Sequence, residues 1–311
     1  MELLQLKYFV TVARFEHMTR AAEELRIAQP ALSKTIKTLE KSLGVLLFDR
    51  HGKHIQLNQY GRIFLKRVNQ ALSALEDGER ELADLSGETF GDIKLAVVVG
   101  SNLLPGLLSS FRKQHPNISF NLLQHFSKAV TGQDFDLCIS SSPLKLQGIT
   151  NITLLTEEIF LAVPIEHRLA KRTSIRLSEV SEDGFINLKY GKALRDRTDS
   201  FCKYAGFSPN IIFESDDPAT VRGLIKAGQG IAFIPAISWG GSTGSSMVLL
   251  HIDEPECTRS IELSWTVERY LPQAARIFRK FTIDYFAKLV LESKNYSNVI
   301  ANDTTKSCKQ P

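Results

Sequence analysis

The sequence predicts an α/β protein in three parts: an all-α N-terminal unit with a small hairpin, a linker helix, and a larger two-lobed α/β domain. Helix-periodic segments fill the first 43 residues and precede a short hairpin pattern, a helical pattern of about 25 residues starts near Tyr60, and strand and helix patterns alternate from residue 92 onward. The 311 residues are 43% hydrophobic and 23% charged, which favours about two globular domains over a disordered chain.

The expected boundaries follow these changes of pattern. They are residues 1–58 for the N-terminal unit, 59–89 for the linker helix and hinge, 90–293 for the α/β domain, and 294–311 for a polar tail that we expect to be disordered. Within the α/β domain we expect one lobe over about 90–160 and 266–293, and a second over about 161–265.

Several classes of protein are excluded by what the sequence lacks. The sequence contains no run of about 18 apolar residues, so we expect no transmembrane helix. The N-terminus has no basic segment that leads into a long apolar one, so we expect no secretory signal and a cytoplasmic location. The cysteines are 138, 202, 257 and 308, and their spacing matches no metal site and no redox pair. Scattered reduced thiols suit a reducing compartment.

Charge is distributed unevenly along the chain. Residues 1–70 hold twelve basic and six acidic side chains, whereas residues 71–90 hold one basic and six acidic side chains. Basic charge gathered at one end is typical of nucleic-acid binding. By itself this is a weak signal, because solvated basic faces are common.

The N-terminal unit predicts three helices. The first has apolar residues at helical spacing around Phe9. In the second, Thr19 is placed to cap a helix from Arg20 to Leu25. The third begins at Gln29-Pro30, because proline is favoured in the first helical turn. Its buried stripe is predicted to contain Leu32, Ile36, Leu39 and Leu43.

The opposite face of the third helix carries polar and basic side chains: Gln29, Ser33, Lys34, Lys37 and Lys41. Two lysines four residues apart repel each other on an isolated helix, and a bound polyanion removes that penalty. Gln bonds an adenine edge with two hydrogen bonds, and Ser serves several bases. This face predicts a helix that reads the major groove.

A hairpin follows the third helix. Two short apolar runs flank the basic, glycine-containing segment 50–54, in which Arg50 and Lys53 are the cations. A cationic hairpin tip beside a recognition helix lies along phosphates or reaches the minor groove. The alternative is an ordinary exposed turn. Together the helices and hairpin predict a DNA-binding winged helix-turn-helix.

The segment from Leu6 to Gly61 resembles the winged helix-turn-helix of the LysR-type bacterial transcriptional regulators. The resemblance is carried by Leu6, Phe9, Thr19, Ala21-Ala22, Leu25, Gln29-Pro30-Ala31-Leu32-Ser33, Ile36, Leu39-Glu40, Leu43-Gly44, Leu47-Phe48, Arg50, Leu57 and Gly61. Two positions depart from the family pattern: Ala28 stands where Ser is common, and Asn58 stands where Thr is common. We expect the DNA contacts to come from Thr19, Gln29, Pro30, Ser33, Lys34, Lys37, Arg50 and Lys53.

The linker helix carries a heptad-like seam. Its members, in steps of four and three, are Phe64, Val68, Ala71, Leu75, Gly78, Leu82 and Leu85. Such a helix either packs on its own domain or pairs with a second copy. The resemblance favours pairing, since LysR-type regulators dimerise through this helix and commonly form dimers of dimers. We therefore expect a homodimer or homotetramer.

The remainder predicts an α/β sandwich with mostly parallel strands. Strands are expected at 92–99, 118–123, 135–140, 159–164, 185–188, 211–214, 230–234 and 261–267, and helices at 103–115, 193–205, 217–227 and 272–291. This part resembles the LysR-type effector domain, which has the fold of periplasmic solute-binding proteins. The resemblance extends to about residue 290 and implies two lobes joined by crossings near 160 and 265.

Ligands of such folds occupy the crevice at the carboxyl ends of the strands. Three loops are expected to line it, and their candidate effector-binding residues are Ser101, Asn102, Phe126, Ser127, Lys189 and Tyr190. Backbone N–H groups at a helix N-terminus, together with Lys189, favour an anionic small molecule. Each of these loops has a plain alternative, namely helix capping for Ser101 and ordinary solvated loops for the others. Only nine residues separate Phe126 from Asp136, fewer than the family usually has.

Enzymatic readings find little support. No dinucleotide fingerprint or phosphate loop is present, and no nucleophile has a recognisable base. We expect no catalytic residues, cofactor or metal site. The expected partners are duplex DNA and a small-molecule effector, with RNA polymerase as a further candidate. Two alternatives remain open: an architectural DNA binder whose sensor domain does not respond, and a solute-binding protein that only captures ligand.

Overall fold

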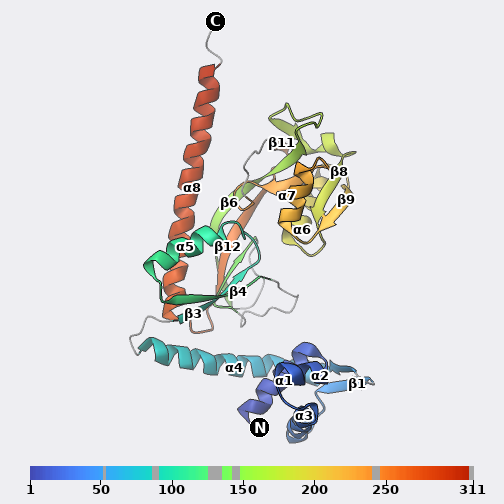
Figure 1. Ribbon diagram of the computed structural model, residues 1–311, viewed down its shortest axis with the longest axis vertical. Helices are drawn as coiled ribbons and strands as arrows, with labels where there is room; N and C mark the ends of the chain where they lie inside the picture. Colours follow the sequence, from blue (N-terminus) through green and yellow to red (C-terminus); the bar gives the residue numbers. More distant parts are fainter. Residues whose placement is uncertain (52–53, 86–90, 125–134, 142–147, 240–245, 308–311) are drawn as a thin grey trace. The chain divides into compact units, whose positions relative to one another are not determined.

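The structure is a computed structural model that describes residues 1–51, 54–85, 91–124, 135–141, 148–239 and 246–307 (Figure 1). Side chains are described except at 50, 51, 54 and 292–307. The chain divides into two compact units, Met1–Gly87 and Glu88–Pro311. Each unit is considered by itself below.

The N-terminal unit contains three short helices, a hairpin and a long helix. Helices α1 (Leu3–Phe15), α2 (Met18–Glu24) and α3 (Gln29–Leu43) precede strands β1 (Phe48–His51) and β2 (His54–Leu57), and α4 (Gln59–Leu85) follows. The two strands pair antiparallel with Phe48 opposite Leu57. The helices and the hairpin share one apolar core around Phe9, whose ring contacts the rings of Phe48 and Phe64. The predicted winged helix-turn-helix is therefore present.

The C-terminal unit is built on one curled sheet of eight strands. Its order is β4-β3-β5-β12-β6-β11-β7, with β10 also paired to β6. The strands are β3 (Gly91–Val97), β4 (Ile118–Leu123), β5 (Leu137–Ser140), β6 (Ile149–Pro164), β7 (Ser174–Arg176), β10 (Ala232–Pro235), β11 (Met247–Glu254) and β12 (Thr258–Thr266). A separate parallel pair consists of β8 (Gly184–Leu188) and β9 (Asn210–Ser215). Helices α5 (Leu104–Gln114), α6 (Ala193–Tyr204), α7 (Pro218–Lys226), α8 (Gln273–Ser307) and the 3-10 helix η1 (Leu177–Val180) complete the unit.

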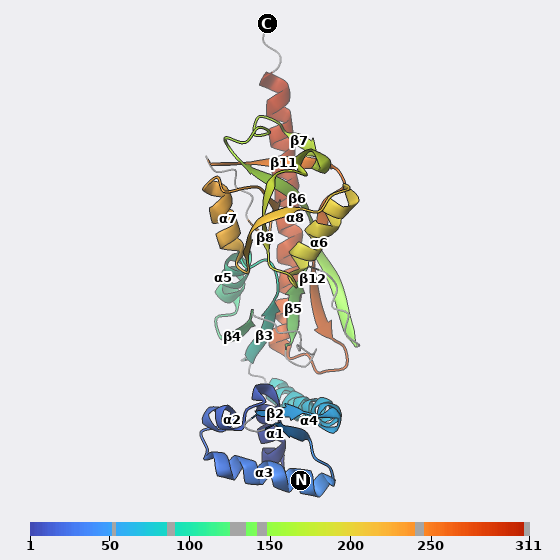
Figure 2. The ribbon, with the colours of Figure 1, turned by 90° about the vertical axis from the view of Figure 1, so that its right-hand side faces the viewer.

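The α/β class is confirmed, but the expectation of mostly parallel strands is wrong. Parallel pairing joins β3 to β4 and β5, β7 to β11, and β8 to β9. Antiparallel pairing joins β12 to β5 and β6, and β6 to β10 and β11. Each of these antiparallel pairs contains β6 or β12, two strands that run side by side in opposite directions (Figures 1 and 2).

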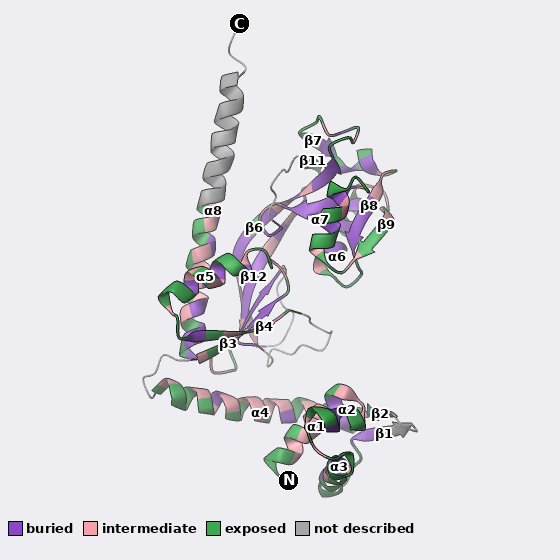
Figure 3. Ribbon diagram, viewed as in Figure 1, coloured by how far each residue is buried: buried purple, intermediate pink, exposed green. Residues whose placement is uncertain are grey.

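Two hydrophobic cores define two lobes. The first core lies between the β3, β5 and β12 strands and helices α5 and α8, and the second lies among β6, β8, β10, β11, α6 and α7 (Figure 3). Cys257 belongs to the second core, whereas Ile261 and Leu263 on β12 belong to the first. The return crossing therefore lies near 258–260, not near 265 as expected. The alternation of apolar residues along β12 marks a strand but does not reveal which core its inner face joins.

The last helix is longer than expected. Helix α8 continues to Ser307, past residue 294, the expected start of a disordered tail. No glycine or proline occurs between Gln273 and Ser307, so no residue in this stretch forces the helix to end. Its first half buries Ala275 and Phe278 against the first core.

Candidate nucleic-acid interface and effector site

Helix α3 presents two chemically distinct faces. Leu32, Ile36 and Leu39 are fully buried against the other helices, as the spacing predicts. Pro30 occupies its first turn, and Gly44 ends it with a φ of 71°. The buried Glu40 carboxylate accepts a hydrogen bond from the Leu47 backbone at 2.9 Å and so ties the end of α3 to the hairpin. The helix is therefore fixed in orientation by both its core side and its C-terminal end.

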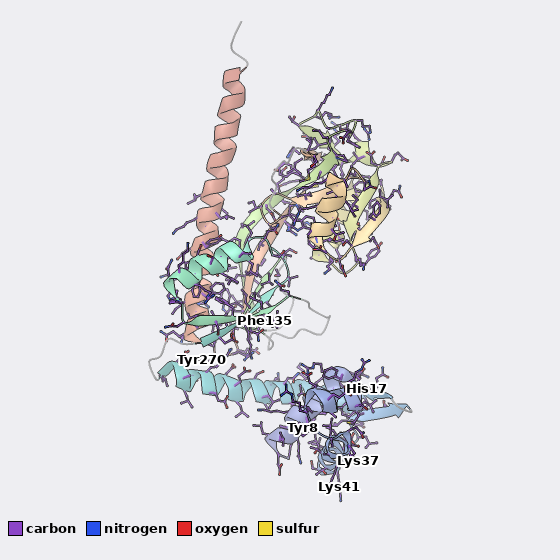
Figure 4. The ribbon with its side chains drawn as sticks, in the orientation of Figure 1. Tyr8, His17, Lys37, Lys41, Phe135 and Tyr270 are labelled. Carbon is purple, nitrogen blue, oxygen red and sulfur yellow. The ribbon has the colours of Figure 1, made fainter. Side chains whose placement is uncertain are left out.

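The outer face of α3 is polar, basic and open. Gln29, Lys34, Lys37 and Lys41 are exposed, and Ser33 is half-buried. Figure 4 shows Lys37 and Lys41 projecting from α3 away from α1 and α2. One shallow hollow is lined by Gln29, Pro30, Ser33, Lys34, Lys37, Thr38 and Lys41. In the part of the chain that the structure describes, none of these lysines has a carboxylate within ion-pair distance.

Thr19 does not cap α2 as predicted. The helix begins one residue before it, at Met18, and its N-cap is His17, whose Nδ1 accepts from the Arg20 backbone at 3.4 Å. Thr19 lies inside the first turn with its side chain exposed. Ser and Thr are common caps, but His supplies an acceptor of the same reach, so the rule selected the wrong residue.

The two departures from the family pattern, Ala28 and Asn58, lie at the starts of α3 and α4. Ala28 stands at the N-cap of α3 and provides no side-chain cap. Asn58 caps α4, since its Oδ1 accepts from the Gly61 backbone at 2.9 Å and its amide donates to the Leu46 carbonyl. A Cβ at Gly61 would stand 2.1 Å from the Leu47 carbonyl oxygen, so only glycine fits against the hairpin there.

The predicted wing is present as the β1–β2 hairpin. Lys53 and the Arg50 side chain lie outside the described residues. Leu57 is held by Glu16, whose Oε1 accepts from the Leu57 backbone at 2.9 Å. The hairpin is thus anchored to the end of α1.

Helix α4 leaves part of its apolar seam uncovered. Val68 is buried and Phe64 is partly buried in the apolar core of the N-terminal unit. Leu75, Leu82 and Leu85 are 55%, 70% and 79% exposed within the single chain. The first part of the seam therefore packs in the core of its own unit, whereas its last leucines are exposed in the single chain.

In the first lobe, the candidate effector residues Ser101 and Asn102 lie in the turn between β3 and α5. Both are exposed, and Gly100 opens the turn with a φ of 78°. The N-cap of α5 is Leu103, with no side-chain cap, so Ser101 does not serve as the capping residue that we weighed as its alternative role. Phe126 and Ser127 lie outside the described residues.

In the second lobe, Lys189 and Tyr190 follow the carboxyl end of β8. Lys189 is exposed and faces Asp216 at 3.8 Å, and the Tyr190 ring lies over the Arg195 guanidinium at 4.3 Å. The adjacent strand β9 ends at Ser215, opposite Leu188. The two segments therefore stand together at one end of the parallel pair.

Arg195 was missed by the sequence analysis. Its side chain is 3% exposed, and it donates to Asp199 at 2.6 Å, to Glu214 at 2.7 Å and to the Leu188 carbonyl at 3.0 Å. Burial lowers its pKa, but the hydrogen bonds to Glu214 and Asp199 outweigh burial, so the pKa of Arg195 is raised. The i, i+4 pairing with Asp199 was a readable signal, while Glu214 is joined only by the fold.

Other classes of site receive no support. Among the residues that the structure describes, no cluster of three His, Cys, Asp or Glu side chains is arranged to hold a metal ion. Of the helices described, none has the length and hydropathy needed to cross a membrane.

Comparison with known proteins identifies both units. A model of the lysR-family bacterial regulatory helix-turn-helix matches residues 3–62, and a LysR substrate binding domain model matches 86–287. The Bacillus subtilis (strain 168) HTH-type transcriptional regulator YybE is 40% identical over 93% of this chain and all of its own.

Solved structures show the same fold. Full-length OxyR C199D from Pseudomonas aeruginosa superposes with a TM-score of 0.69 at 23% identity, covering 91% of this chain and 94% of its own. Full-length CbnR, solved with its target DNA, gives 0.62 at 22% identity, covering 91% and 99%. The chain therefore belongs to the LysR family of bacterial transcriptional regulators, which bind DNA and are not enzymes, and its C-terminal unit is an effector-binding domain.

Proposed function

We propose that this regulator reads its operator with the outer face of α3 and contacts phosphates with the hairpin. The observation that carries the proposal is the open row on α3, where Gln29 and Ser33 stand near the N-terminus and three lysines follow without carboxylate partners. Residues near the N-terminus of a recognition helix reach base edges, and lysines neutralise phosphates. Of the other proposed contacts, Pro30 lines the same hollow, while Thr19, Arg50 and Lys53 are proposed from the sequence alone.

A gel retardation experiment tests the proposal. The full-length protein is first used to select its preferred site from random duplexes, and binding is then measured across salt concentrations. Lys37→Ala should weaken binding to all sequences alike and reduce the slope of log affinity against log salt by about one. Lys113→Ala, an exposed lysine on α5, is the matched control and should leave affinity and slope unchanged. If the two variants behave alike, α3 does not carry the interface.

We further propose that a small anionic molecule controls the regulator from the crevice between the lobes. Support comes from the Gly100–Asn102 turn at the N-terminus of α5 in one lobe, and from Lys189 and Tyr190 at the end of β8 in the other. Phe126 and Ser127 are proposed from the sequence to line the same crevice. A ligand that binds one arrangement of the lobes better than another shifts the population toward it.

Isothermal titration of the full-length protein against matched anionic and neutral metabolites tests this. We expect binding heat for an anion, and Lys189→Gln should weaken that binding. An architectural DNA binder with an unresponsive sensor predicts no heat with any compound. A solute-binding protein predicts heat but no retardation of any DNA.

The oligomeric state, the protein partner and the cellular location are part of the same proposal. We infer a homodimer paired through the uncovered end of α4, with a tetramer as its further state and RNA polymerase as a candidate partner. Exposed leucines repeating along one helix are typical of a pairing seam. Because its proposed target is DNA, we propose that the regulator acts in the cytoplasm.

A further inference from the structure

Two segments of the chain pass between the two cores of the C-terminal unit, and a third segment of the second lobe touches the first core. On β6, Leu155 packs in the first core and Ile159 in the second, and β12 makes the reverse passage between Cys257 and Ile261. The third segment follows β10: Ile234 and Trp239 belong to the second core, and Ile237 between them packs against the first. A change in the angle between the lobes must bend β6 and β12 at these crossings and move Ile237 relative to the first core.

One side-chain cluster joins all three segments. Glu157 on β6 and Arg259 on β12 are direct partners in the strand register, and the Glu157 Oε1 accepts from Arg259 Nε at 2.8 Å. Its Oε2 accepts from the backbone N–H groups of Ile237 and Ser238, each at 2.8 Å. The Ser238 hydroxyl donates to Glu157 Oε1 at 2.6 Å and accepts from Arg259 Nη2.

The cluster is withdrawn from solvent. The Glu157 and Arg259 side chains are 0% and 4% exposed. Burial lowers the pKa of Arg259, and the charge of Glu157 opposes that effect. A buried ion pair is tolerated only when its geometry is good and its remaining hydrogen bonds are made. Four donors on one carboxylate meet that condition only while the three segments keep their present spacing.

We propose that the Glu157–Arg259–Ser238 cluster is the pivot that holds the two lobes at one resting angle. Because a buried network is either satisfied or broken, it resists small displacements and gives way as a unit. An effector that changes the lobe angle acts against this cluster, so the cluster sets how much binding energy the response requires. The pivot itself follows from the contacts alone, whereas its regulatory meaning depends on the proposed effector function.

The distance between the lobes in the full-length protein tests the pivot. Spin labels are attached to Ser109→Cys on α5 and Lys203→Cys on α6, two exposed positions in different lobes, in a Cys308→Ser background. The remaining native cysteines are buried. Labelled protein is mixed with an excess of unlabelled protein, so that most assemblies hold one labelled copy and only the distance within one chain is measured. Electron–electron double resonance should then give one narrow distance distribution for the unaltered pivot. Ser238→Ala and Arg259→Lys should widen or shift that distribution.

Thr156→Ala is the matched control. The Thr156 hydroxyl lies 3.2 Å from the Ser260 hydroxyl, so this variant removes another side-chain contact between β6 and β12, but an exposed one. It should reproduce the unaltered distribution. Glu157→Gln perturbs the pivot most strongly, and the two milder variants decide the question if it does not fold.

The proposal is overturned if Ser238→Ala and Arg259→Lys, both folded by circular dichroism, give the same distribution as Thr156→Ala. The measurement needs neither DNA nor effector. A failure of the effector proposal would leave the distances unaffected, so the two failures are distinguishable.

Discussion

At the scale of single residues, Gln29 makes the sharpest prediction. Its side chain stands exposed at the first position of α3, beside Pro30 and Ser33. A paired glutamine–adenine contact is worth about 1–3 kcal/mol of discrimination, so Gln29→Ala should lose that much on the selected site and accept any base at one position. Selection from random duplexes measures this directly.

Thr38→Ala is the control for Gln29→Ala. Thr38 lines the same hollow, but its hydroxyl already donates to the Lys34 carbonyl at 2.9 Å, so it has no proton left to donate to a base and cannot make the paired contact expected of Gln29. Its selected sequence should match that of the unaltered protein. An unchanged profile for Gln29→Ala would remove Gln29 from base readout.

The described cysteines yield a second prediction at this scale. Burial raises the pKa of Cys138, Cys202 and Cys257 to about 12, so all three remain thiols at neutral pH. The thiolate is the reactive form. Native protein treated with iodoacetamide at pH 7.5 should therefore remain unmodified at these positions by peptide mass spectrometry, and unfolding in guanidinium should expose them. Rapid labelling of the native protein at any of the three would contradict the prediction.

Residue-level inference from sequence succeeded where spacing alone decides burial. The stripe of Leu32, Ile36 and Leu39 was predictable because one helix repeat fixes which side faces the core. It failed for Glu157 and Arg259, which are 102 positions apart and meet only through strand register. A charged residue in an apolar strand signals a buried partner, but the sequence does not say which partner.

At the scale of elements, the start of α7 gives a prediction with a pH signature. The Asp217 carboxylate accepts from the backbone N–H groups of Ala219 and Thr220, both at 3.1 Å, and these contacts lower its pKa. Asp217→Ala should cost about 1 kcal/mol of stability, as lost N-caps do. The folded pKa lies below the unfolded one, so the charged cap contributes above about pH 4 and its contribution is lost as pH falls through the folded pKa.

Thermal unfolding of the two proteins between pH 7 and pH 3 measures this. The difference in melting temperature between Asp217→Ala and the unaltered protein should shrink at the acidic end. Asp217→Asn retains an acceptor oxygen and should melt close to the unaltered protein at pH 7. A destabilisation of Asp217→Asn equal to that of Asp217→Ala would show that the hydrogen bonds are not what stabilises the helix start.

Elements differ in how far the sequence determines them. The expected helix at 193–205 corresponds to α6, because one amphipathic pattern covers its whole length. The expected strand at 159–164 is only the second half of β6, which starts at Ile149. Its first half alternates less clearly, because Asn151 and Thr153 turn toward polar partners on β12. Polar cross-strand pairs conceal a strand from a search for apolar alternation.

At the scale of the whole molecule, the order of the strands was beyond the sequence. The resemblance supplied two lobes, but the pattern of apolar residues does not state that β12 lies between β5 and β6. For the same reason the second crossing between the lobes lies at 258–260 and not near 265, where the sequence led us to expect it. Local periodicity determines which side of a helix or strand is buried. Long-range strand pairing determines which other elements cover that side.

The proposed dimer predicts how binding depends on the spacing of the two half-sites. Two α3 helices related by a two-fold axis enter successive major grooves on one side of the duplex, with half-sites about 34 Å apart or a multiple of that. Inserting about 5 base pairs turns one half-site to the far side of the DNA, so affinity should fall toward that of a single half-site. Inserting about 10 base pairs restores the facing and should recover much of the affinity. Band-shift competition with the selected site measures the series, and an isolated half-site sets its lower limit. Equal affinity for all spacings would mean that each N-terminal unit binds its half-site independently. Only a paired molecule has to fit both half-sites at once, so only a paired molecule responds to the rotation between them.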